Sequence, residues 1–556
     1  MIVREQLAAA LGRALEDLRG SGAVETTEVP AIQLDVPPAP ELGDFSSDVA
    51  VALARQARKS PADVAALLVG RLDAPAGLID RVDVSGSGFL NFHLGPKWLH
   101  DAVRQARARG ADFGKSEEVG EGQSVLVEFV SAYPTGPLSV THGRGGALGD
   151  ALANALEWNG YRVVREFYVN DAGSQMERFG KSLEACYLQT LGRPGVAPPV
   201  DGYHGQYIVD LAKSIRDKVG DEYAELPAEE RLRVLTERGR AAVLEQQRAT
   251  LARFGVRFDE WRSEKALHES GKLQEVLERL RESGHTYETD GALWLRSTSL
   301  GDTEDRPLRR GNGQPTYLSG DLTYHQEKFA RGFDCVVNIW GADHEDYIGR
   351  TRAGLQALGR DPGALEVLLF QPVAVKIDEM SIEGAALTGN NLGLDEVIEE
   401  VGADSARFFY LTRSPGSPLT LDLDLARSAS AENPAQYVRL VRDRTAEAVR
   451  AAAGSLPAAE VDLAPLVHPS ERALMRKLAE LPDEIRATVR DRDPSRLTRY
   501  THALASALDV FYLDAPLAGG GAETDAARLA LLQAGEGALS NALRVMGIGA
   551  AGPSGS

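Results

Sequence analysis

The sequence predicts an α/β fold built on a doubly wound parallel sheet, with a small α/β unit before it and a helical bundle after it. From about residue 120 to 425, short apolar runs alternate with stretches of helical periodicity. This alternation is typical of a parallel sheet covered by helices on both faces. Residues from about 428 to 548 have helical periodicity almost throughout, which favours a bundle.

The domain limits follow from these changes of pattern. We expect domains at 1–112, 118–427 and 428–548, with a helix-rich insertion at about 175–310 inside the second. The last residues, 549–556, are mostly small and predict a disordered tail. A chain of 556 residues is long enough for three or four domains of ordinary size.

The N-terminal unit begins with a predicted helix at 4–18 and a strand-like segment at 31–35. The run Gly-Asp-Phe-Ser at 43–46 leads into a second helix that ends near Ala57. The run Gly-Phe-Leu-Asn-Phe at 88–92 predicts a strand after a glycine turn. Taken alone, these patterns indicate only a generic α/β accessory domain.

The central and C-terminal domains are marked by apolar runs and by breaks. Strands are predicted in the central domain at 124–131, 161–169, 335–340 and 365–375. Charged helical faces in the insertion, such as 273–281, are typical of solvated surfaces. Breaks rich in Pro, Ala and Gly interrupt the helical region at 451–457 and 516–522.

Charge and cysteine content exclude several classes of protein. The chain has 61 Lys and Arg against 81 Asp and Glu, a net charge of −20, which argues against a histone-like basic binder. RNA can still bind a local basic track. Cys186 and Cys335 lie far apart, so we expect neither a disulfide nor a zinc site, and a cytoplasmic location. There is no signal-peptide pattern at the N-terminus and no membrane-length apolar run.

The segment from Tyr133 to Asp150 is the most informative in the chain. An apolar run at 125–130 predicts a buried strand before it, and residues 143–158 have helical spacing after it. A turn rich in Pro and Gly therefore joins a strand to a helix, with His142 at the helix start. The unpaired N–H groups and the positive dipole end at such a helix start favour phosphate binding.

The turn, Pro-Thr-Gly-Pro-Leu-Ser-Val-Thr-His-Gly-Arg-Gly, resembles the ATP signature of class I aminoacyl-tRNA synthetases, and of the arginyl-tRNA synthetases in particular. The resemblance implies a Rossmann-like catalytic domain, an N-terminal domain that contacts tRNA and a helical anticodon-binding domain. It implies that His142 is catalytic and that Ser139 and Thr141 lie beside ATP. In the family, Ser139 is a second His and Thr141 is a Gly that lets adenine approach the backbone.

Two further blocks resemble the family's substrate-binding segments. Phe167 to Gly173 matches its Tyr-Ile-Asn-Asp-Ala-Gly block and implies that Asn170 and Asp171 lie near the substrate. The block that begins at Pro315 supplies Tyr317 and Asp321, which lie on one face if the segment is helical.

The family directs this Tyr and Asp, with a Glu that is Glu128 here, at the guanidinium of arginine. Carboxylates suit that planar, permanently charged group. Tyr133 replaces a family Asn that contacts the other end of the substrate, so it would shorten the pocket or select a different ligand.

The remaining ATP-handling positions are partly changed. The block Trp340 to His344 is kept, and the resemblance implies that its Gly341, Asp343 and His344 lie near ATP and its ribose. The family's mobile loop, Lys-Met-Ser-Lys, keeps here only Met380 and Ser381, which we also expect beside ATP. Its two lysines are replaced by Glu379 and Ile382, and the Arg that follows is replaced by Glu383.

Two functions remain open at this point. The first is an arginine–tRNA ligase that uses ATP with Mg²⁺, because the resemblance spans nearly the whole chain and the guanidinium acceptors are retained. The second is a paralogue that still binds arginine or tRNA but has lost adenylation. The clustered changes favour the second, because one lost charge donor typically costs about 3–4 kcal/mol at a transition state. An unrelated nucleotide-binding enzyme is disfavoured by the register of the blocks.

The expected partners are arginine or an arginine-like small molecule, and tRNA, with no membrane and no oligomerisation. The cationic residues of the first C-terminal helix would form a phosphate track for tRNA or a solvated face, and the sequence does not separate these alternatives. They are Arg439, Arg442, Arg444 and Arg450.

Overall fold

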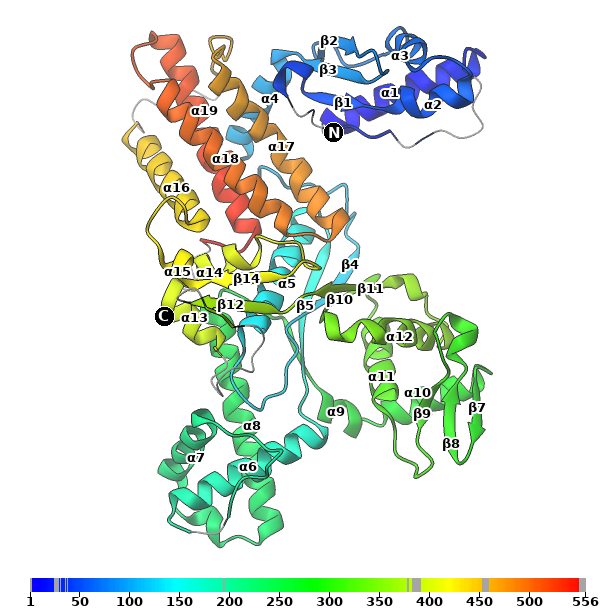
Figure 1. Cartoon of the computed structure of the whole chain (residues 1–556), viewed down its shortest axis with the longest axis vertical. Coiled ribbons are helices and arrows are strands. Elements are labelled where there is room, and N and C mark those ends of the chain that lie inside the picture. The colour runs from blue at the N-terminus through cyan, green and yellow to red at the C-terminus, as the bar shows by residue number, and fades with distance from the viewer. Residues whose placement is uncertain are drawn as a thin grey trace. The chain divides into compact units, whose positions relative to one another are not determined.

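The computed structural model describes residues 3–24, 30, 32–35, 37, 39–193, 196–377, 380–382, 392–452 and 460–549. The chain forms two compact units (Figure 1). One comprises Met1–Gly114, Asp443–Asp483 and Ala503–Leu539, and the other comprises Lys115–Arg442, Glu484–His502 and Ser540–Ser556.

The N-terminal region contains a three-stranded antiparallel sheet in the order β1-β3-β2, with helices packed against it. The strands are β1 (Phe45–Ser47), β2 (Ile79–Val84) and β3 (Leu90–Leu94), and the helices are α1 (Val3–Gly20), α2 (Val49–Ala57), α3 (Pro61–Val69) and α4 (Pro96–Arg109). The expected α/β unit is confirmed. Of the strand expected at 31–35, residue 31 lies outside the described residues and Asp35 forms a single bridge with Ser46.

The second unit is built on a five-stranded parallel sheet in the order β11-β10-β4-β5-β6. Its strands are β4 (Ser124–Glu128), β5 (Arg162–Val169), β6 (Glu260–Ser263), β10 (Cys335–Gly341) and β11 (Leu365–Phe370). The predicted doubly wound parallel sheet is confirmed, although the sequence did not predict β6, which has only four residues.

The strand predicted at 365–375 is wrong in one respect, because it is two strands in different sheets. β11 ends at Phe370, and β12 (Val373–Ile377) joins a small sheet in the order β13-β12-β14. Pro372 lies in the gap and has no N–H to donate to a ladder. The partners of β12 are β13 (Met380–Ile382) and β14 (Leu419–Asp422).

Helix α5 (Val140–Trp158) connects β4 to β5 and is buried along nearly its whole length. A Cβ on Gly149 would lie 2.2 Å from Cγ of Phe129, so glycine is needed for α5 to pack on the end of β4. Arg407 of α14 (Ala403–Tyr410) also holds this helix, because its Nη2 donates to the Asp150 carboxylate at 2.5 Å. Both side chains are almost fully buried.

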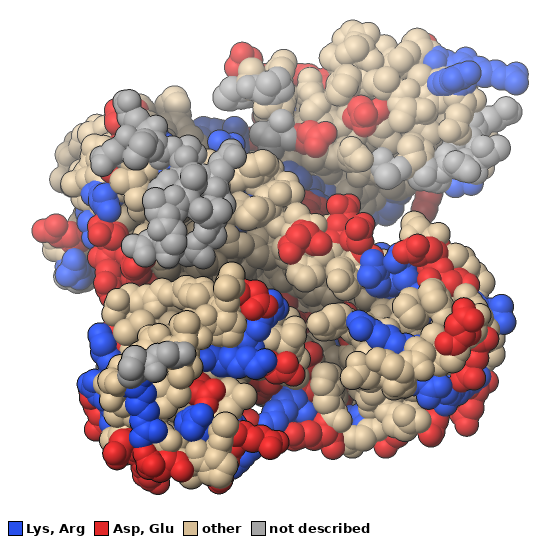
Figure 2. Space-filling view, turned by 60° about the horizontal axis from the view of Figure 1, so that its bottom comes forward, with Lys and Arg blue, Asp and Glu red and all other residues tan. Residues whose placement is uncertain are grey.

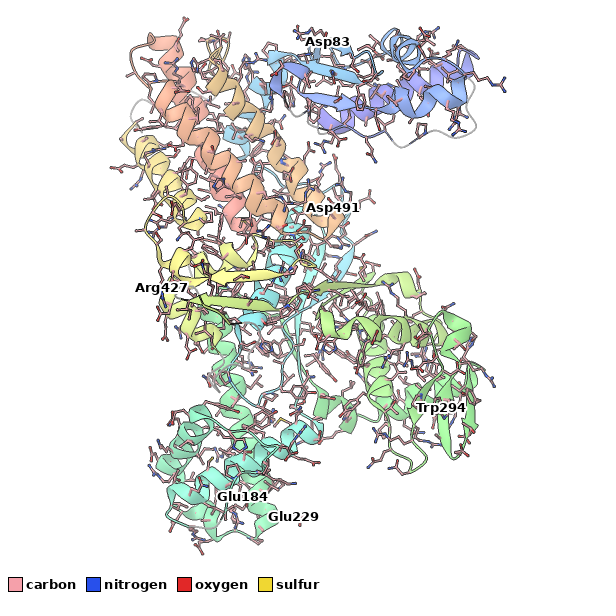
Figure 3. All side chains as sticks on the ribbon, viewed as in Figure 1. Asp83, Glu184, Glu229, Trp294, Arg427 and Asp491 are labelled. Carbon is pink, nitrogen blue, oxygen red and sulfur yellow. The ribbon has the colours of Figure 1, made fainter. Side chains whose placement is uncertain are left out.

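The first part of the insertion is formed by helices without strands, whereas the second part combines helices and strands. Helices α6 (Gly173–Thr190), α7 (Gln206–Val219) and α8 (Ala228–Arg253) enclose a core of their own. Glu184 of α6 pairs with Arg231 of α8 at 2.6 Å (Figure 3). Acidic and basic side chains are interspersed over the face turned toward the viewer in Figure 2, as expected for solvated helices.

The second part of the insertion contains strands that the sequence did not predict. After β6 come α9 (Glu264–Glu269) and α10 (Lys272–Glu282), and then an antiparallel sheet in the order β7-β8-β9. Its strands are β7 (Thr286–Thr289), β8 (Ala292–Leu295), which carries Trp294 in Figure 3, and β9 (Arg306–Arg309). They precede α11 (Tyr317–Ala330) and α12 (Glu345–Ala357).

The C-terminal part is helical, as predicted. It contains α16 (Pro434–Ala451), α17 (Pro469–Asp491), α18 (Ser495–Asp514) and α19 (Ala522–Val545), and it follows α13 (Leu394–Val401), α14 and α15 (Leu423–Arg427). The break expected at 516–522 separates α18 from α19, whereas most of the break at 451–457 lies outside the described residues. Among the helices that the structure describes, none is both long and apolar enough to span a membrane.

Candidate active site at the carboxyl edge of the parallel sheet

The motif blocks meet at the carboxyl edge of the parallel sheet. Ser131 to Leu138 follow β4, Asn170 and Asp171 follow β5, and Ala342 to His344 follow β10. Open α/β sheets bind their ligands at this edge. The fold therefore brings segments that are distant in sequence to one side of one sheet.

The turn after β4 is strained and firmly held. Val130 has a φ of 70° and Ser131 a φ of 34°, both unusual for residues with a side chain. The Ser131 hydroxyl donates to Oε1 of Glu128 at 2.7 Å and accepts from the Tyr168 amide at 3.1 Å. The amide of the buried Gln247 donates to the carbonyls of Tyr133 and Gly136, each at 2.9 Å.

His142 lies in the first turn of α5, as predicted, and Ser139 is the N-cap residue. The Ser139 amide donates to Nδ1 of His142 at 3.1 Å. Burial lowers the pKa of His142 to about 4, so its imidazole is neutral near pH 7. With Nδ1 accepting, the hydrogen-bond network assigns the ring proton to Nε2. The helix start thus presents a neutral N–H donor beside its own backbone amides.

Thr141 is directed at the small sheet. Its Oγ1 accepts a hydrogen bond from the Val373 amide, the first residue of β12, at 3.3 Å. The hydroxyl that replaces the family's glycine hydrogen therefore links α5 to the strand that leads into the mobile-loop segment. A glycine at position 141 could not form this hydrogen bond. The threonine also puts a side chain at a position where the family motif has only a hydrogen atom.

The segment after β10 is open to solvent. Gly341 ends the strand, and the carboxylate of Asp343 folds back over it, so that a Cβ on Gly341 would lie 2.5 Å from Oδ1. Asp343 and His344 lie in the 3₁₀ turn η5 (Ala342–His344), with side chains 82% and 53% exposed. Both are therefore accessible to a ligand at this edge.

The segment at 379–383, which corresponds to Lys-Met-Ser-Lys and the Arg after it, is described only in part. Met380 and Ser381 lie on β13, where Ser381 pairs with Lys376 of β12, but only their backbones are described. Glu379 and Glu383 lie outside the described residues, as does the side chain of Ile382. Nζ of Lys376 lies 3.0 Å from the Asp422 carboxylate.

Three of the predicted substrate-binding residues line one cleft of about 400 Å³, namely Tyr133, Tyr317 and Asp321. Thr316 caps α11, so Tyr317 and Asp321 do lie four residues apart on a helix. Tyr168 of β5 and Glu264 of α9 also line this cleft. Its walls thus combine three tyrosine side chains and two carboxyl groups with the His268 imidazole and the Arg310 guanidinium.

The two carboxyl groups of the cleft are poised between their charged and neutral forms. Burial and the nearby Asp171 carboxylate raise the pKa of Glu264 to about 7. Burial, Glu264 and Glu128 raise the pKa of Asp321 to about 7. Glu264 thus disfavours the ionised state of Asp321, and a bound cation would remove this penalty. The cleft is therefore suited to a permanently charged cation.

Glu128 is placed differently from Asp321. It does not line the cleft, and its carboxylate is paired with Nζ of the buried Lys328 at 2.5 Å. Asp171 is also fully engaged, because it accepts from the Ser263 hydroxyl at 2.8 Å, the Lys265 amide at 3.0 Å and Arg240 at 3.2 Å.

Burial raises the pKa of the Tyr133 hydroxyl and the Asn170 side chain opposes that rise, so Asn170 lies close to a residue of the cleft. The roles assigned to Asn170, to Asp171 and to the other site residues stay predictions.

The sequence missed Glu264, Tyr168 and Lys328. Glu264 directly follows β6, so its place at the carboxyl edge would have been evident had that four-residue strand been recognised. Tyr168 stacks on Tyr324 with ring centroids 4.0 Å apart, which no sequence signal indicates.

Comparison with known proteins covers nearly the entire chain. A family model for the arginyl-tRNA synthetase N-terminal domain matches residues 2–94, one for the class I (R) tRNA synthetase catalytic domain matches 105–407, and one for the DALR anticodon-binding domain matches 441–552.

Individual proteins match over the same length. The chain is 42% identical over 554 residues to the arginine–tRNA ligase of Heliobacterium modesticaldum, with 98% of each chain covered. The arginine–tRNA ligase of Moorella thermoacetica is also 42% identical, over 549 residues and 98% of each chain.

The fold agrees with a solved structure as well. The arginyl-tRNA synthetase of Thermus thermophilus superposes with a TM-score of 0.78 at 22% identity, covering 98% of this chain and 99% of that one. Three family models in the expected order, together with full-length relatives, place this chain in the arginyl-tRNA synthetase family of the class I aminoacyl-tRNA synthetases.

Proposed function

We propose that this chain is an arginine–tRNA ligase, which activates arginine with ATP and transfers it to tRNA(Arg). One observation carries the proposal beyond family membership. The cleft at the carboxyl edge of the sheet pairs Asp321 with Glu264, and both have a pKa near 7 in a site lined by tyrosines. Such a pair favours a ligand with a fixed positive charge, as in the guanidinium of arginine.

Arginine binding draws on the charge and the shape of the cleft. The carboxylates of Asp321 and Glu264 accept hydrogen bonds from the guanidinium, and the rings of Tyr168 and Tyr317 offer π-faces to a planar cation. Tyr133 borders the same cleft, where its hydroxyl meets the Asn170 amide. The amino-acid end of the ligand is then directed toward the ATP-binding helix start.

Activation joins the arginine carboxylate to the α-phosphorus of ATP. A carboxylate oxygen forms the new P–O bond, the bond to the β-phosphate oxygen breaks, and pyrophosphate leaves with that electron pair. The α5 amides and Nε2–H of His142 stabilise negative charge on the phosphate oxygens. ATP would enter as its magnesium complex. The terminal ribose hydroxyl of tRNA then attacks the acyl carbon, the bond from that carbon to the AMP oxygen breaks, and AMP leaves with the electron pair while the hydroxyl proton passes to solvent.

The first helix of the C-terminal domain supplies the proposed tRNA contacts. Arg439 and Arg442 line a cleft of about 590 Å³ beside α14 and α15. Arg444 is engaged with Asp509 at 2.5 Å and stacks over Tyr512. We infer that Arg439 and Arg442 neutralise phosphates, so that replacing both with Gln flattens the dependence of tRNA affinity on salt. The ligase is inferred to act as a monomer in the cytoplasm.

The two departures from the family motif within the turn, Ser139 and Thr141, do not remove the helix-start site. Ser139 retains the N-cap and orients His142, and Thr141 forms a hydrogen bond to β12. The alternative of a paralogue without adenylation gains no support from relatives that are 39–42% identical over the whole chain.

The test is aminoacylation of tRNA(Arg) with labelled arginine, comparing the unaltered protein with Asp321→Asn and with a control at an exposed site, Glu269→Gln. Charging by the unaltered protein and the control, with much weaker charging by Asp321→Asn at the same limiting arginine concentration, supports the proposal. Absence of charging in all three would overturn it.

A further inference from the structure

A buried chain of polar groups lies next to the cleft and is not part of it. Nζ of Lys328 donates to Oε2 of Glu128 at 2.5 Å and to Oδ1 of Asn338 at 2.9 Å. The Asn338 amide reaches Nε2 of His325 at 2.7 Å, and Nδ1 of His325 is 2.8 Å from the Asp321 carbonyl. The chain thus runs from the end of β4 to the residue that faces the ligand.

Lys328 is the cationic member of this chain, and its side chain is completely buried. It also lies over the Tyr324 ring, with Nζ 4.2 Å from the ring centroid. Burial of an ammonium group away from water is unfavourable unless the group has an oppositely charged partner and hydrogen-bond acceptors, and Lys328 has both. Glu128 is equally committed, because its second oxygen accepts from the Ser131 hydroxyl at 2.7 Å.

The charge of Lys328 acts on the cleft through Asp321, which lies seven residues earlier on the same helix. Lys328 favours the ionised form of Asp321, whereas Glu128 and Glu264 disfavour it. The two members of the buried pair therefore have opposite effects on the same carboxyl group. Because their effects oppose each other, the pKa of Asp321 stays near 7, where binding of a cation shifts its carboxyl group to the ionised form.

Other groups also face Asp321 and would contribute to its titration. Arg350 of α12 favours its ionised form, and Tyr168 of β5 is coupled to it. Burial and then Lys328 lower the pKa of His325 to about 3, so His325 stays neutral over the working pH range. His268 of α9 and Arg310 line the cleft with Asp321 as well.

We propose that Lys328 is a positioning residue: it holds Glu128 away from the cleft and supplies the charge that keeps Asp321 available to a cationic ligand. The inference rests on the proposed function in one respect, because the cation is taken to be arginine. It differs from the expectation that Glu128 contacts the guanidinium, since Glu128 is here a partner of Lys328. Specificity for the cation then resides in Asp321 and Glu264.

The test follows the titration of Asp321 in the ligand-free protein by ¹³C NMR of labelled aspartate carboxyls, assigned with Asp321→Asn. Lys328→Met should raise the midpoint by about one pH unit, because an attractive charge is lost. Glu128→Gln should lower it, because a repulsive charge is lost. The double variant should return close to the unaltered protein, and Lys328→Arg should titrate like it.

Arginine affinity supplies the second measurement. A midpoint raised by about one unit reduces the affinity of Lys328→Met about fivefold at pH 7 and about twofold at pH 8, with no loss at pH 9. A purely structural role would weaken binding equally at all three pH values. Lys272→Met is the matched control, because Lys272 is an exposed lysine that pairs with Glu327 at 3.7 Å. It should leave both measurements unchanged.

Each outcome decides the matter. Opposite shifts of the single variants that cancel in the double variant support the positioning role; shifts of the same sign, or none in folded protein, overturn it. If Lys328→Met does not fold, Glu128→Gln and the double variant decide, because the double variant buries no unpaired charge. If arginine binds to no variant, the proposed function fails, whereas the Asp321 midpoints still test Lys328.

Discussion

Arginine affinity should fall steeply as the pH falls from 8 to 6. The reason lies in Glu264 and Asp321, whose pKa values near 7 leave each carboxyl mostly ionised at pH 8 and mostly protonated at pH 6. A guanidinium binds the ionised forms, so each bound proton must first be released. The sign is therefore fixed: affinity rises with pH through about 7 and then reaches a plateau.

The magnitude follows from the two pKa values. A carboxyl with a pKa of about 7 is about 91% ionised at pH 8 and about 9% ionised at pH 6, a tenfold change worth about 1.4 kcal/mol. Two such groups give at most about a 100-fold change in the dissociation constant. In Glu264→Gln the like charge beside Asp321 is gone, so the pKa of Asp321 falls and the pH dependence shrinks below about tenfold.

Isothermal titration calorimetry measures both quantities. Repeating the titration in buffers of different ionisation heat gives the protons released, which should approach two per arginine near pH 6 in the unaltered protein. The matched control is Glu269→Gln, which changes an exposed glutamate on the same helix. Any titration of the ligand itself contributes equally to the dissociation constants of Glu264→Gln and Glu269→Gln, so it cancels when the two are compared. A dissociation constant unchanged between pH 6 and 8, with no proton release, would refute the reasoning.

Further substitutions test other parts of the account. Asp321→Asn should raise the arginine KM about 10- to 100-fold because a charged hydrogen bond is lost, whereas Tyr317→Phe, at a side chain 68% exposed, should cost less; equal effects in steady-state kinetics would contradict this. Arg407→Met should lower the free energy of unfolding by about 3–5 kcal/mol, because Asp150 is left buried without this partner, and denaturant titration showing under 1 kcal/mol would disprove it. Thr141→Gly should lower the ATP KM, because it removes the side chain beside the expected adenine position, and should cost about 1 kcal/mol in stability; an unchanged or higher KM would argue against that placement.

Local patterns were sufficient to predict the parallel sheet and the position of its ligand edge. Strands β4, β5 and β10 are short segments rich in Val and other β-forming residues, and parallel strands bring the loops after them together. Tyr317 and Asp321 could be placed on one face because helical spacing is a property of the segment alone. The four-residue β6 could not be predicted, since it becomes a strand by pairing with β5, and Glu264 was missed with it.

Contacts between distant residues were the other part that the sequence did not reveal. Glu128 and Lys328 are 200 residues apart, and only the fold shows that they form a buried pair. Asp171 was expected near the substrate, but its carboxylate binds the start of α9 and Arg240 of α8. A sequence motif shows that a carboxylate is present but does not show whether it faces a ligand or a neighbouring helix.

The most direct test of the central claim is arginine-dependent exchange of pyrophosphate into ATP, measured with and without tRNA(Arg). The proposed ligase should catalyse exchange that requires arginine and that Asp321→Asn greatly weakens at limiting arginine, because activation needs both the cation cleft and the helix start that carries His142. Complete absence of exchange in folded protein, with arginine and tRNA(Arg) both present, would contradict the account and would leave a binding protein with the fold of the family.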